Sequence, residues 1–362
     1  MVRCLSVALF LSPHVVQGHW LPATRPASQL MPHSSPPRHS SRREVLGGSA
    51  LLGWQLLGAP APALAGPPAV SEGVSLDYAT KAEIAAEQKR SEANSKLVDK
   101  QAKKIFDAGV DFANRGSDPE TQKIDAILLR KAEDRFTILT DEVAPNFIGG
   151  YTNRANVRVV LNNLDGALAD YEKAIELAPL ASDVWVTRLN RGSTLLALGR
   201  DDAALAELEL AVKSSKGDGV AVLQRGAALH QLGRYEEAAK DYGQVVEKNG
   251  LDIQPYWLRY ALELFAVGRR QEALGIARRV ANKFDLEPEV VLAVSAMLWE
   301  NGGDSETTEA LERWRVTPKA IKQKAAVLPG SETLKARQWP PQAEKAAAVF
   351  LQALPPALRV AQ

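Results

Sequence analysis

One pattern recurs along the chain, and its spacing limits the possible fold more than any other feature. Arg154, Arg191 and Arg225 follow one another at nearly equal intervals, each in a segment with apolar residues at helical spacing. An alanine follows each arginine at a constant distance in sequence, at Ala167, Ala204 and Ala238. A fourth copy begins at Tyr260, after a similar interval. A period of about 34 residues that contains two helical segments predicts stacked helix-turn-helix units.

The repeated positions resemble those of the tetratricopeptide repeat family. That family places small residues where the two helices of a unit cross, an aromatic or apolar residue in the second helix, and a proline at the end of that helix. The first copy supplies these residue types as Ala167, Tyr171, Ala174 and Pro179. The resemblance covers residues 148–284. It implies an all-α fold, an α-solenoid of antiparallel helix pairs that forms a superhelix.

The segments on either side of residues 148–284 read as degenerate copies, so we expect the complete array to span residues 116–316. Residues 66–115 are expected to form a linker and a mostly exposed N-terminal capping helix. Residues 317–362 form a proline-containing tail with a short helix, which we expect to fold back or to bind a partner. Trp339 stands beside Pro340 in this tail, and we expect it to be exposed as a partner anchor.

Residues 1–65 have the composition of a targeting sequence. Residues 13–40 are rich in Ser, Pro, Arg and His, which is typical of a plastid transit peptide. Arg42 and Arg43 then precede a short apolar run that ends in Ala-Leu-Ala before Gly66, as in a twin-arginine signal. A transmembrane helix is the alternative, but Pro60 and Pro62 interrupt the run. We predict delivery to the chloroplast thylakoid lumen, and apolar residues 4–12 leave a secretory-type first signal open.

The distribution of charge, cysteine and histidine excludes several kinds of site from residues 66–362. This part carries 39 basic and 42 acidic side chains and lacks the basic excess of a nucleic-acid-binding protein. Cys4 is the only cysteine, and His230 is the only histidine after residue 39. A disulfide, a thiol nucleophile and a Cys/His zinc site are therefore excluded there. We expect no catalytic residue, no metal and no cofactor.

An arginine on the inner side of a helix needs a partner, because an unpaired buried charge is costly. An acidic residue follows each repeated arginine at one fixed interval, in the predicted second helix of the same unit. The resulting structural pairs are Arg154 with Asp170, Arg191 with Glu207, and Arg225 with Asp241. In the fourth copy both charges are replaced, by Tyr260 and Ile276. We therefore interpret the arginines as structural contacts within each unit rather than as ligand-binding groups.

We expect the first helix of each unit to line a concave groove that binds partners. The candidate residues are mostly amides and charged side chains near the repeated arginines and at related positions of the fourth copy. They are Asn153, Asn156, Asn190, Ser193, Gln224, Gln231, Arg259 and Glu263. Amides both donate and accept, which suits recognition of a peptide main chain. For Asn153 and Asn190, a hydrogen bond to their own backbone is the alternative.

His230 has no predicted nucleophile beside it, and we interpret it as a structural histidine. The thylakoid lumen acidifies in light, and a histidine with an ordinary pKa near 6.5 would titrate in that range. A pH-sensitive contact at His230 is therefore a hypothesis.

The sequence predicts a non-enzymatic protein-interaction scaffold of the thylakoid lumen, without a membrane span in the mature chain. From its address, we expect it to assist assembly or maintenance of photosynthetic membrane complexes by binding their lumenal segments. Two alternatives remain. One is an enzymatic or small-molecule-binding lumenal protein that uses the groove, and the other is a structural lumenal protein without a dedicated partner.

Overall fold

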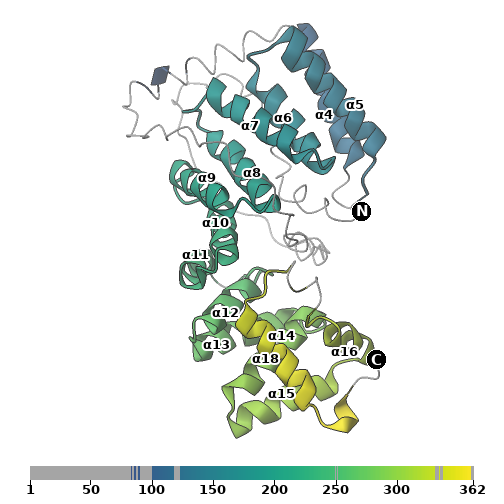
Figure 1. Ribbon diagram of the computed structural model, residues 1–362, viewed down its shortest axis with the longest axis vertical. Helices are drawn as coiled ribbons and strands as arrows, with labels where there is room; N and C mark the ends of the chain where they lie inside the picture. Colours follow the sequence, from purple (N-terminus) through teal and green to yellow (C-terminus); the bar gives the residue numbers. More distant parts are fainter. Residues whose placement is uncertain are drawn as a thin grey trace, which may run out of the picture.

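The computed structural model describes residues 100–117, 123–248, 252–330 and 337–359, together with 83, 85, 86, 89, 250 and 334. Residues 1–65, where we predict the targeting signals, lie outside the described residues. The described part is an α-solenoid in which successive helices pack in antiparallel pairs (Figure 1). The paired helices are α4 (Lys100–Gly116) with α5 (Ala126–Ile138), α6 (Ile148–Val160) with α7 (Leu164–Leu177), α8 (Val184–Ala197) with α9 (Asp201–Ser214), α10 (Gly219–Gln231) with α11 (Tyr235–Lys248), α12 (Trp257–Ala266) with α13 (Arg270–Lys283), and α14 (Pro288–Asn301) with α15 (Asp304–Val316).

Within each pair we call the first helix A and the second helix B. Each helix B also packs against the helix A of the next pair, so the pairs stack into a continuous array. Neighbouring A helices touch as well, namely α4 with α6, α6 with α8, α8 with α10, and α12 with α14. These direct contacts place the A helices on the inner side of the curve.

The turn from helix A to helix B has the same backbone conformation in four successive units. One residue at each turn has a positive φ angle: Asn162 (64°), Gly199 (69°), Gly233 (72°) and Gly268 (80°). The next residue donates its amide hydrogen back to the last turn of helix A, as Arg200 does to the Leu195 carbonyl at 3.0 Å. This bond closes the end of helix A with a left-handed residue, which favours glycine or asparagine.

Small residues let the two helices of a unit approach closely. The repeated alanines Ala167, Ala204, Ala238 and Ala273 are fully buried. Gly192 of α8 lies against Leu208 of α9, where an added Cβ would stand 2.7 Å from the leucine side chain. The larger side chains of helix B, such as Tyr171 and Tyr242, fill the space around these contacts and are also fully buried.

At the N-terminal end, α4 begins within residues 66–115, where we expect a linker and a capping helix. α4 is the helix A of a complete pair, and it buries Phe106 within 5.9 Å of the Phe136 ring and 5.2 Å of the Phe147 ring, measured between centroids. Gly109 provides the room that the Phe136 ring needs. The apolar spacing of α4, rather than the polar segment before it, determines how this helix packs.

The C-terminal end contains α16 (Lys319–Ala326), α18 (Pro341–Ala353) and the short 3₁₀ helix η3 (Pro356–Leu358). α16 packs on α14, and α18 folds back across the A helices α14 and α12 (Figure 1, yellow). At the other end of the array, the π-helical turn η2 (Leu139–Val143) connects α5 to the segment before α6. A glycine also ends α14, as in α8, α10 and α12, with Gly302 at a φ angle of 76°.

Candidate functional site

Two of the repeated arginines form two-point contacts with the acidic residue that follows them in helix B. Arg154 Nε and Nη2 donate to the two carboxylate oxygens of Asp170 at 2.9 and 2.8 Å. Arg225 donates to Asp241 in the same way, at 2.7 and 2.6 Å. Paired bonds of this kind are strong and fix the orientation of both side chains. They join helix A to helix B inside each unit, as the sequence spacing predicts.

The remaining pair, in α8 and α9, is less enclosed. Arg191 Nη1 donates to Glu207 Oε1 at 2.8 Å, and the other oxygen of Glu207 accepts from Arg188 at 3.2 Å. Arg191 also approaches Glu172 of the preceding helix B, with 3.7 Å between Nη2 and Oε1. The arginine therefore connects its own unit with the unit before it.

The pair in α6 and α7 belongs to a larger network of charges. Arg154 Nη1 donates to Asp141 of η2 at 2.9 Å, and Asp170 also accepts from Arg158, which contacts Glu133 of α5. Burial disfavours the charged form of Arg154, but the hydrogen bonds to Asp170 and Asp141 outweigh this effect and raise the pKa of Arg154. The hydrogen bonds of Arg154 and Arg158 thus connect α5, η2, α6 and α7.

The fourth unit dispenses with the pair by using apolar packing. Tyr260 and Ile276 are partly buried and pack against the C-terminal core. The Tyr260 ring lies against Gly243 of α11, where an added Cβ would stand 3.1 Å from the ring. Replacement of both charges by apolar groups avoids the cost of an unpaired one.

The structure does not present the predicted groove residues as an exposed lining. Asn153, Asn156, Asn190, Gln224, Arg259 and Glu263 are buried, whereas Ser193 and Gln231 are partly exposed. The reason is the close approach of the A helices to each other, which encloses polar side chains between neighbouring units. Most of these residues are therefore not exposed, as binding of a partner in the groove would require.

The buried asparagines instead connect parts of the frame. Asn153 Nδ2 donates to the Gly149 carbonyl of its own helix at 2.8 Å, which is the alternative that its residue type suggests. Asn156 Oδ1 accepts from Tyr171 at 2.7 Å and from Asn190 Nδ2 at 3.3 Å. Asn190 of α8 is thus bound to the preceding unit rather than to its own backbone.

His230 contacts Glu263, which is one of the predicted groove residues. Its Nδ1 lies 2.6 Å from Glu263 Oε1 across the interface of α10 and α12, and the Glu263 side chain is fully buried. The Tyr235 ring lies 5.4 Å from the imidazole, centroid to centroid. His230 therefore joins two units, and its response to pH stays a prediction.

The C-terminal helix covers the inner side of the last two units. Phe350 of α18 is fully buried between Trp299 and Trp314, with ring centroids 6.0 and 5.5 Å away. The Trp314 indole nitrogen donates to the Leu358 carbonyl at 3.1 Å, after the end of α18. The tail thus covers part of the inner side, where we expect partners to bind.

The carboxylate of Glu289 accepts hydrogen bonds from the segment that precedes α18. Glu289 accepts from Arg337 Nη1 at 2.7 Å and from the Trp339 indole nitrogen at 2.8 Å, one bond on each oxygen. Arg259 of α12 donates to the main-chain carbonyl of Gln338 at 3.0 Å. Trp339 is only 5% exposed, so the expectation of an exposed anchor in this tail is wrong. Sequence reasoning missed Glu289, whose only signal is a carboxylate at the start of an apolar helix.

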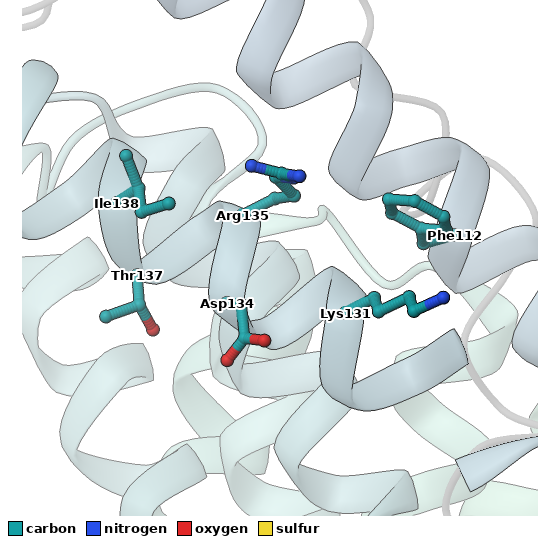
Figure 2. Close-up of a pocket in the computed structure, with 6 residues that line it drawn as sticks. All are labelled: Phe112, Lys131, Asp134, Arg135, Thr137 and Ile138. Carbon is teal, nitrogen blue, oxygen red and sulfur yellow. The ribbon is translucent and has the colours of Figure 1, made fainter. Parts of the chain in front are cut away.

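An open hollow of about 590 Å³ lies between α4 and α5. Figure 2 shows Phe112 on α4, facing side chains that extend from α5. The lining residues are Phe112, Lys131, Asp134, Arg135, Thr137 and Ile138. None of the predicted groove residues belongs to it.

Two further properties concern the part of the chain that the structure describes. No helix in it is both long enough and apolar enough to cross a membrane. Within the same residues, no group of three or more His, Cys, Asp or Glu side chains is placed to hold a metal ion.

Two segments of the chain match the family model described as tetratricopeptide repeat. The matched residues are 148–179, which form α6 and α7, and 221–247, which form α10 and α11. The chain matches none of the curated proteins.

Several solved structures are similar to this chain. A tetratricopeptide repeat protein from Parabacteroides merdae is 17% identical, with 70% of this chain and 92% of that one covered at a TM-score of 0.49. YrrB, described as a TPR protein with an unusual peptide-binding site, is 22% identical, with 49% and 89% covered and a TM-score of 0.43. MamA is 15% identical, with 51% and 92% covered and a TM-score of 0.42.

Proposed function

We propose that this chain is a non-enzymatic protein-interaction scaffold of the thylakoid lumen. In this role it assists the assembly or maintenance of photosynthetic membrane complexes by binding their lumenal segments. The helix-pair array and the two matched repeats support the scaffold, because stacked repeats provide an extended binding surface.

One observation carries the proposal: the A helices α12 and α14 already bind a peptide segment, the chain's own tail. Arg259 binds the main chain of that segment, and Glu289 binds its side chains. An inner surface that holds one peptide through both kinds of contact has the chemistry to hold others.

The first experiment tests the predicted delivery to the thylakoid lumen. Residues 1–65 are fused to a fluorescent protein and expressed in plant cells, and the reporter is located by fractionation of chloroplasts. We expect it in the thylakoid lumen. The matched control replaces Arg42 and Arg43 by lysine, which keeps the charge but removes the twin-arginine motif, and this reporter should remain in the stroma. A wild-type reporter outside the plastid would remove the basis of the lumenal role.

The second experiment tests the partners. The full chain, with an affinity tag, is crosslinked in intact thylakoids and purified, and bound proteins are identified by mass spectrometry. Enrichment of photosystem or cytochrome complex subunits over a tagged, unrelated lumenal protein is the expected result. A co-purified metabolite would instead favour the small-molecule alternative, and recovery of neither would favour a structural protein without a dedicated partner.

A further inference from the structure

The segment before α18 is bound in the manner of a ligand. Glu289 is 5% exposed and lies in the first turn of α14, where its two oxygens receive Arg337 and Trp339 separately. The residue between them contributes only its carbonyl, to Arg259. The contact thus distinguishes the first and third side chains, whereas no hydrogen bond recognises the buried middle side chain.

We propose that the inner face of α12 and α14 is a binding site for segments with an arginine and a tryptophan separated by one residue, followed by a short amphipathic helix. Residues 337–354 of this chain fill the site in cis. This inference rests on the proposed scaffold function and names the chemistry of its ligand. A partner with the same features would replace the tail.

The bound tail is not optimised at its central residue. Gln338 has a φ angle of 53°, a left-handed conformation that side chains other than glycine and asparagine rarely adopt. Both polar atoms of its side chain are buried without a hydrogen bond. These costs weaken the cis contact and favour replacement by a segment that avoids them.

The helical part of the ligand contributes apolar contact. Ala343, Ala346 and Ala347 are buried, and their small side chains let α18 approach α14 closely. Phe350 supplies the large anchor beside Trp299 and Trp314. A competing segment therefore needs small residues on one helix face and an aromatic residue near the end of that helix, as in this tail.

A covalently attached ligand has a high effective concentration, typically in the millimolar range. A free peptide should therefore bind the full wild-type chain weakly and should bind better when the chain's own tail is weakened. Variants in the tail change only the occupant, whereas variants at Glu289 change the site itself.

The test uses a fluorescent peptide with the sequence of residues 331–359 and measures its anisotropy with the full chain. We expect Phe350→Ala in the chain to tighten peptide binding about tenfold. Adding Glu289→Gln to that variant should reverse the gain by about tenfold, because Gln cannot accept both charge-assisted bonds. A peptide with Trp339→Ala is the matched control and should bind the Phe350→Ala chain more weakly than the unchanged peptide does, because it lacks the indole that donates to Glu289.

Circular dichroism determines whether Phe350→Ala remains folded. If Phe350→Ala does not fold, Arg337→Ala replaces it in the test, because it removes only one partly exposed contact of the tail. Failure of the peptide to bind a folded tail variant, or binding that is indifferent to Glu289→Gln, would overturn the inference. Such a result would leave the scaffold proposal standing if photosynthetic subunits are still recovered by crosslinking. If the peptide binds as expected but crosslinking recovers no photosynthetic subunits, the binding site is supported and the proposed photosynthetic role is not.

Discussion

At the scale of single residues, the repeated arginines show how a solenoid can bury charge on the inner side of its helices. Each one pairs with an acid of its own helix B, and Arg154 and Arg191 also approach an acid of the preceding unit. The carboxylates are the more enclosed members. In the unit of α10 and α11, the Asp241 side chain is 5% exposed and that of Arg225 is 26% exposed.

This difference predicts an asymmetric response to substitution. Arg225→Met should cost about 3 kcal/mol of unfolding free energy, because it leaves a buried carboxylate unpaired. Asp241→Leu should cost less, since Arg225 can reach water. The double variant should be more stable than Arg225→Met alone, as the apolar pair of the fourth unit suggests. Urea denaturation of the full chain measures all three.

The exposed pair Arg234–Glu237 in the same unit is the control for that cycle. Arg234→Met should leave the denaturation curve unchanged, because water screens both charges. Equal costs for Arg225→Met and Arg234→Met would show that burial is not what makes the repeated arginine important.

At the scale of helices and turns, the recurring left-handed residue fixes where each helix A ends. An added side chain at Gly233 would meet no atom within 4 Å, so only its backbone conformation disfavours substitution. Gly233→Ala should therefore cost about 1 kcal/mol. Gly233→Asn should cost less, because Asn162 adopts the same conformation in the unit of α6 and α7. Thermal unfolding of both variants checks the order, and a more stable alanine variant would contradict it.

Contacts within one unit could be predicted from sequence, and contacts between distant units could not. The Arg225–Asp241 pair was predictable because the same interval separates an arginine from an acid in three copies. The contacts of Glu289 with Arg337 and Trp339 span 48 and 50 residues and occur once, so no periodicity indicates them. Burial of the asparagines also escaped prediction, because it depends on how closely neighbouring A helices approach.

At the scale of the whole molecule, ion pairs between helices of different units set the response to acid. Arg278 of α13 donates to Glu309 of α15, and these hydrogen bonds outweigh burial and hold the pKa of Glu309 below its ordinary value of 4.5. A carboxylate with a lowered pKa stabilises the fold fully above its unfolded-state pKa. This stability is lost as the pH falls through the lower pKa of the folded state.

We therefore expect the unfolding free energy to stay constant from pH 7.5 to about pH 5 and to fall below about pH 4.5. Glu309→Gln should lose less stability over the acidic range, since it has no carboxylate to protonate there. Urea denaturation at a series of pH values measures both. A marked fall between pH 7 and pH 5.5 would contradict this.

The course of α18 across both α12 and α14 has a mechanical consequence. A repeat array pulled from its N-terminal end ordinarily unravels one unit at a time, because each unit contacts only its neighbours. Here the single helix α18 contacts two units. Under a pulling force these two units should therefore unfold together, in one large extension. The earlier units have no such helix across them among the described residues and should peel away in smaller, separate steps.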